Sequence, residues 1–225
     1  MVKTLILLLL APLAGFAQHS SDEKGPIPAS LKPGTMFVNT YYLTDSSDAL
    51  VKPGADQEIP GDDTQIVVQS GVHLYGHSDC VAVTGPGHPD TNIYSFAKNG
   101  DVYLLNTNRK AWDFFPFGLK PGKVVKTEPM LDTGSAVGHH YEMMDHHELY
   151  VEGHEKLGLD GTSYECTKLV MVKVDVFEGA EYKNATTYWY SPKIGYFLRA
   201  KFGWGGKFFL NQRILTYKPK SSAVD

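Results

Sequence analysis

From residue 35 onward the chain alternates short runs of aromatic and β-branched residues with clusters of Gly, Pro, Asn, Asp and Ser. After the first 17 residues, no window of a dozen residues places apolar side chains at i, i+3, i+4 and i+7 without a Gly or Pro inside it. An amphipathic helix requires that spacing, so we expect a mostly β protein. The predicted strands cover residues 35–44, 65–74, 80–84, 91–98, 101–106, 137–157, 164–176, 185–190, 196–202 and 207–217.

Turn signals separate these strands. Asn99-Gly100 lies between two strand-like runs, and this pair favours a tight hairpin in which both turn residues take positive φ. A second turn is expected at residues 191–195. So many short strands in one flat sheet would leave aggregation-prone edges. We therefore expect a single curled antiparallel sheet, a half-barrel or open barrel, formed by one domain at residues 31–218 and followed by a flexible tail at 219–225.

The first 17 residues have the pattern of a targeting signal. Lys3 precedes an apolar run that begins at Leu5, and small residues Gly15 and Ala17 lie where a signal peptidase cleaves. This pattern is typical of a secretory signal peptide. We expect a mature chain that begins near Gln18, with a flexible segment at 18–30 and no transmembrane segment, located in the periplasm or outside the cell.

Composition excludes several classes of protein. With 42% hydrophobic residues the chain is not disordered, and a formal net charge of -4 argues against a nucleic-acid partner. The chain has 2 cysteines, Cys80 and Cys166. In an oxidising compartment they form a disulfide or remain as two buried free thiols, and the sequence leaves both alternatives open.

Five of the nine histidines lie between positions 139 and 154. If that stretch is one strand, alternate side chains share a face. The even-numbered positions then present a ladder of His and Glu, and the odd-numbered ones, including Leu149 and Val151, face the core. Imidazole and carboxylate groups two residues apart can converge on Zn or Cu; the alternative is a solvated strand face. The candidate ligands are His140, Glu142, His146, Glu148, Glu152 and His154.

Aromatic residues are dense between positions 182 and 217. Such rings fill the core of a curled sheet, or they line an apolar concavity that is open to a lipid-like ligand. The sequence does not separate these alternatives. The candidate ligand-binding residues are Tyr188, Trp189, Tyr190, Tyr196, Phe197 and Phe202.

Signals for catalysis are few. The chain has no G-x-S-x-G, P-loop or C-x-x-C motif. Asp132-Thr133-Gly134 resembles the active-site tripeptide of aspartic proteases, but a single copy would serve only a dimeric, single-copy enzyme, and the tripeptide is also ordinary turn chemistry. We therefore expect no catalytic residues and no enzyme, with the aspartic-protease-like reading as a remote alternative.

A family resemblance covers about a quarter of the chain. Gly161-Thr162, Tyr164 and Cys166, followed by Thr187-x-Trp189-Tyr190-x-Pro192-x-x-Gly195, resemble a pattern in uncharacterised secreted bacterial β-domains. Those domains look like relatives of the lipoprotein-carrier half-barrel, a sheet wrapped around an apolar cavity. The resemblance implies a fold and no catalytic residues.

Together these features predict an exported, non-enzymatic β-domain that binds a hydrophobic molecule, a lipid or an envelope protein in its concave face. No cofactor is expected. The alternative is a periplasmic metal-binding protein that uses the 140–154 ladder.

Overall fold

The computed structural model describes residues 24–53, 59–74, 76–85, 91–106, 111–136, 139–177, 179–204 and 208–220, with the backbone alone at 106, 111, 130–136, 139–143, 177 and 204. These residues contain strands, turns and irregular segments and no helix. The strands form one antiparallel sheet in the order β7-β6-β5-β4-β3-β1-β14-β13-β12-β11-β10-β8, with β2 beside β1 and β9 beside β10. Because β7 and β8 end the order without pairing to each other, the sheet is open, and the predicted fold class is confirmed.

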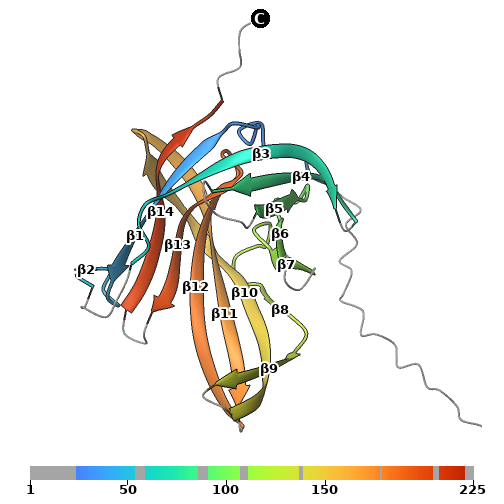
Figure 1. The fold of residues 1–225 in the computed structure, drawn as a ribbon, viewed down its shortest axis with the longest axis vertical. Helices are drawn as coiled ribbons and strands as arrows, with labels where there is room; N and C mark the ends of the chain where they lie inside the picture. Colours follow the sequence, from blue (N-terminus) through green and yellow to red (C-terminus); the bar gives the residue numbers. More distant parts are fainter. Residues whose placement is uncertain are drawn as a thin grey trace, which may run out of the picture.

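The strands differ widely in length, and the longest form a tall wall (Figure 1). Their bounds are β1 Met36–Thr44, β2 Leu50–Val51, β3 Asp63–Leu74, β4 His77–Thr84, β5 Thr91–Phe96, β6 Val102–Asn106, β7 Ala111–Phe115, β8 Val124–Lys126, β9 Met130–Ala136, β10 His139–Leu159, β11 Thr162–Phe177, β12 Ala180–Ser191, β13 Tyr196–Trp204 and β14 Phe208–Lys218.

Bulges let this sheet curl. The pairing of β3 with β4 shifts register three times between Val67 and Leu74, and single shifts occur where β1 meets β14, β10 meets β11 and β12 meets β13. A bulge bends a strand and increases its twist. In Figure 1, β3 and β4 arch over the upper ends of the wall and bring β5, β6 and β7 down beside it. The sheet therefore has two arms, β3–β7 and β10–β14, which are joined through β1.

The structure differs from the expected elements in its additional strands and at one hairpin. Strands β2, β7, β8 and β9 are additional, and β9 contains Asp132-Thr133-Gly134, for which a turn between strands was one of two interpretations. At the β5–β6 hairpin Gly100 takes a φ of +92°, but Asn99 is not among the described residues with positive φ. The expectation that both turn residues take positive φ is therefore wrong. The chain turns through Ala97 to Asp101, whose backbone groups bond across the loop at 2.9 Å, so the loop is longer than a two-residue turn.

The segment before β1 lies against the sheet where it is described. Lys24 forms a bridge with Ala97, and Gly25 N–H donates to the Phe96 carbonyl at 2.9 Å. Leu31 is fully buried in the core, and Ser30 Oγ donates to the Ile194 carbonyl at 2.7 Å. This segment therefore covers the turn between β12 and β13. The predicted signal peptide lies outside the described residues, as do 221–225 of the predicted tail. Among the residues described, no helix has the length and apolarity needed to cross a membrane.

Candidate functional site

Aromatic rings fill the space where the two arms of the sheet meet. Phe115, at the end of β7, makes an edge contact with Tyr188 of β12 at 5.2 Å between ring centroids. Phe117 stacks on Tyr190 at 4.6 Å, and Tyr94 of β5 meets Tyr196 edge-on at 5.7 Å. Each of these pairs joins residues far apart in the sequence, so they hold the arms together, and aromatic pairs of this geometry are worth about 0.5–1.5 kcal/mol beyond the area they bury.

The six aromatic residues predicted to bind a ligand fall into two groups, one buried and one partly exposed. Trp189, Tyr190 and Tyr196 are buried, each 4% exposed, so within the described structure they belong to the core. Tyr188, Phe197 and Phe202 are partly exposed. Tyr188 contacts Phe197 at 5.6 Å and Phe202 at 6.1 Å. These three rings form one partly exposed aromatic strip, which borders the buried cluster on the wall formed by β12 and β13.

Trp189 differs from its neighbours because strand alternation points it to the other face. The guanidinium of Arg199 lies 4.6 Å from its ring centroid, and the ammonium of Lys168 lies 5.4 Å from it. The structure therefore does not bring Trp189 together with Tyr188 and Tyr190, although the three are consecutive in sequence.

The residues that the sequence reasoning missed come from the other arm. Phe115, Phe117 and Tyr94 complete the aromatic cluster, and Phe37 of β1 stacks on Tyr196 at 4.2 Å. Residues 114–117 read Phe-Phe-Pro-Phe, and this aromatic density was the sequence signal for the cluster. The sequence did not indicate which later strand these rings would contact.

Burial makes the phenols of this cluster resist ionisation. Desolvation raises the pKa of Tyr94 to about 12 and raises the pKa values of Tyr188, Tyr190 and Tyr196 above their ordinary value. The Tyr196 hydroxyl donates to Oε1 of Gln65 on β3. These four phenols are therefore uncharged at physiological pH and add no charge to the aromatic cluster.

The His and Glu ladder does not form one continuous face. His146 and Glu148 pair with Val174 and Val172, but the register shifts between Val151 and Gly153, so that His154 pairs with Thr167. The bulge reverses the alternation, and His154 lies on the face opposite His146. The expectation of a single face is therefore wrong beyond Val151, whereas Leu149 and Val151 are buried as expected.

The described ladder residues have partners other than a metal. Lys126 lies 2.5 Å from Oε1 of Glu148, and His146 Nε2 lies 3.7 Å from the same oxygen. Glu152 pairs with Lys168, and His154 Nδ1 lies 3.3 Å from Thr167 Oγ1. Among the described side chains no group of three or more His, Cys, Asp and Glu is arranged to hold a metal ion. The side chains of His140 and Glu142 lie outside the described residues, so their part of the metal hypothesis stays a prediction.

Cys80 and Cys166 are two buried, free thiols, the second of the alternatives that the sequence left open. Cys80 Sγ lies 3.6 Å from the His77 carbonyl, and burial raises the pKa of this thiol. Burial raises the pKa of Cys166 to about 12. The partly buried His77 imidazole packs against Trp112 at 4.3 Å and lies 3.0 Å from Ser95 Oγ.

Comparison with known proteins finds low similarity to solved structures. No protein-family model and no curated sequence matches the chain. Among solved structures it is similar to the hypothetical lipoprotein YmcC from Escherichia coli K12, with a TM-score of 0.40 and 12% identity over 82% of this chain and 87% of that one. A proposed exported protein with a YmcC-like fold from Bacteroides fragilis has a TM-score of 0.40 and 12% identity over 87% and 99% of the two chains. A proposed lipoprotein from Parabacteroides distasonis has a TM-score of 0.40 and 11% identity over 84% and 96%. The resemblance to the lipoprotein-carrier half-barrel stays a prediction.

Proposed function

We propose that the protein is an exported, non-enzymatic β-domain that binds a hydrophobic, lipid-like ligand along the aromatic strip of Tyr188, Phe197 and Phe202. The observation that carries the proposal is that Tyr188 contacts both Phe197 and Phe202, and that the three rings stay partly exposed beside a buried aromatic cluster. Each methylene of a ligand that leaves water for such a surface gains about 0.8 kcal/mol, so a short stretch of acyl chain suffices for measurable binding.

Export rests on the pattern of the first 17 residues, with Lys3, the apolar run and the small residues before Gln18. A periplasmic or extracellular location follows from that pattern.

Uptake of a fluorescent fatty-acid probe by the purified mature chain tests the proposal. The account predicts saturable binding by the wild-type chain, and Phe202→Ala weakens it about tenfold, as expected when one aromatic contact surface is lost. The matched control is Tyr182→Ala on the neighbouring strand β12, where the ring is 58% exposed and lies outside the strip. If folded wild-type protein takes up no probe, or if both variants lose affinity equally, the proposed site is wrong.

A further inference from the structure

The face of the sheet that carries Trp189 also carries a row of cations. Lys168 on β11 is paired in register with Trp189 on β12, which is paired with Arg199 on β13. Directly opposite residues on neighbouring strands share a face. Lys201, two residues along β13, lies on this same face. Lys168 and Arg199 therefore lie over one buried indole, and the Lys201 ammonium lies 4.3 Å from the ring centroid of Phe209.

Arg199 is held in a fixed orientation. Its Nη2 and Nε donate to Asn211 Oδ1 at 2.8 and 3.3 Å. Asn211 is fully buried, and its Nδ2 donates to Thr44 Oγ1 at 2.9 Å. Asn211 accepts hydrogen bonds only from Nε and Nη2 of Arg199. The other N–H donors of the guanidinium are therefore available to an anion.

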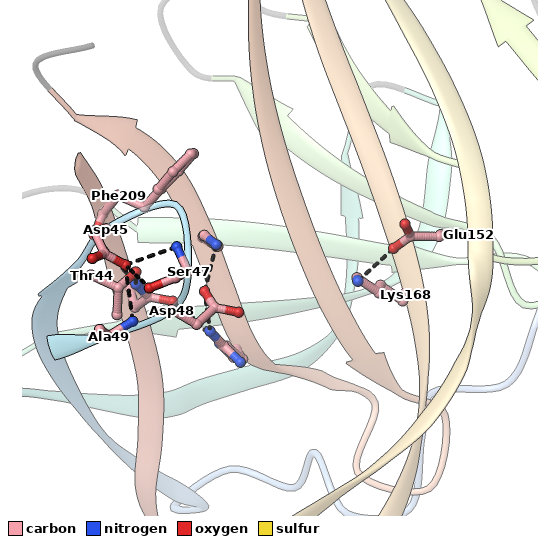
Figure 2. Close-up of polar contacts among 11 residues, drawn as sticks. Thr44, Asp45, Ser47, Asp48, Ala49, Glu152, Lys168 and Phe209 are labelled. Carbon is pink, nitrogen blue, oxygen red and sulfur yellow. Dashed lines mark hydrogen bonds and ion pairs between the residues drawn. The ribbon is translucent and has the colours of Figure 1, made fainter. Parts of the chain in front are cut away.

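A carboxylate of the chain itself lies against these cations. Asp48 Oδ1 lies 2.6 Å from Lys201 Nζ and 3.9 Å from Arg199 Nη2. The turn that presents it is braced by Asp45, whose Oδ1 accepts from Ser47 N–H and Ala49 N–H at 2.8 and 3.1 Å. Figure 2 shows dashed lines from Asp48 to two cationic side chains, with the Glu152–Lys168 pair beyond them.

The cations and the carboxylates differ in exposure. The side chains of Lys168, Arg199 and Lys201 are 28%, 20% and 17% exposed, whereas those of Asp48 and Glu152 are 61% and 52% exposed. The positive groups thus form the floor of the site, and the negative groups lie on it from the solvent side. Trp189 Nε1 is also buried and has no hydrogen-bond partner among the described residues.

We propose that Arg199 and Lys201, flanked by Lys168, form a binding site for a phosphate-class dianion, and that Asp48 is an internal occupant which the ligand displaces. With Asp48 in place, three cations face two carboxylates. A phosphate group carries a charge of about -1.5 to -2 at neutral pH, so it balances the three cations better than Asp48 does. The hydrogen bond from Lys201, together with the positive charges of Lys201, Arg199 and Lys168, also holds the pKa of the Asp48 carboxyl below its ordinary value, so Asp48 is an ionised competitor for the site.

Calorimetric titration with inorganic phosphate tests the proposal. The variant Asp48→Asn removes the competitor and should bind phosphate at least about fivefold more tightly than the wild-type chain, the fold-change that corresponds to one exposed ion pair. Adding Lys201→Gln or Arg199→Gln to Asp48→Asn should abolish that gain. Because Arg199 also holds Asn211, the Lys201 variant keeps the test valid if the Arg199 variant does not fold. Glu181→Gln, which breaks the exposed pair with Lys183 on β12, is the matched control and should leave phosphate affinity unchanged.

Vesicles distinguish the source of the phosphate group. Binding of Asp48→Asn to vesicles with phosphatidic acid, but not to vesicles of phosphatidylcholine alone, assigns the site to a lipid headgroup; phosphate binding without vesicle binding assigns it to a free phosphate. If the Asp48 ion pairs are purely structural, Asp48→Asn should bind neither phosphate nor the acidic vesicles. If folded Asp48→Asn binds neither phosphate nor the acidic vesicles, or if Glu181→Gln raises affinity as much, the proposal is overturned.

Discussion

At the scale of single residues, Gly195 shows how tightly the segment before β1 is joined to the wall. It closes the turn between β12 and β13 with a φ of +69°, and its N–H donates to the Ser191 carbonyl at 2.7 Å. A Cβ atom at this position would lie 2.3 Å from Pro28 Cγ and 3.1 Å from Leu31 Cδ1. Only glycine satisfies both the backbone conformation and the packing.

Gly195→Ala should therefore lower the free energy of unfolding by about 1–3 kcal/mol, through strain at positive φ and displacement of Pro28. Urea unfolding followed by circular dichroism measures this loss. Gly158→Ala is the control, because a Cβ there meets open space and should change stability by less than about 0.5 kcal/mol. Equal effects of the two substitutions would contradict this account of the turn.

The two thiols give a second prediction at this scale. Because Cys80 and Cys166 are buried and their pKa values are raised, neither should react with a thiol reagent at pH 8 in the folded chain, and both should react in denaturant without prior reduction. Rapid labelling of the native chain would show that the thiols are accessible. An unfolded chain that reacts only after reduction would show that they are bridged.

At the scale of elements, the sequence predicted most strands because turn residues and alternation are local. The strand at residues 35–44 and the turn at 191–195 are correct within a residue or two. The predictions that failed are those that depend on where bulges occur. Glu152 is the extra residue that reverses the ladder, and bulge positions depend on pairing that no local pattern reports. The pairing of β1 with β14 joins the two ends of the domain and was likewise beyond a local reading.

The tyrosines of β5, β12 and β13 predict alkaline sensitivity. The folded pKa of Tyr94 is about 12, against 10.0 for a solvated phenol, and burial raises those of Tyr188, Tyr190 and Tyr196 as well. Above pH 10 the unfolded chain loses these protons while the folded chain keeps them, so stability is fully present below pH 10 and falls as pH rises toward 12. The urea midpoint should decline across this window. A midpoint that stays constant up to pH 12 would contradict the burial of these phenols.

At the scale of the whole molecule, the aromatic contacts make two arms into one cooperative unit. Phe117 is 5% exposed and contacts Tyr190, Phe115 and Phe197. Phe117→Ala should lower the free energy of unfolding by about 3–5 kcal/mol and leave a single transition. Val124→Ala, at a 54% exposed position, is the control. A loss below about 1 kcal/mol for Phe117→Ala would mean that this residue does not join the arms.

Hydrogen exchange with and without a long-chain fatty acid tests the central claim, that an apolar ligand binds where the two arms meet. The account predicts slower exchange on ligand addition in residues 111–117 and 184–204, which carry Phe115 and the aromatic strip, and unchanged exchange in the β1–β14 pair. Uniform exchange in all segments at saturating fatty acid, or protection confined to β1 and β14, would contradict it.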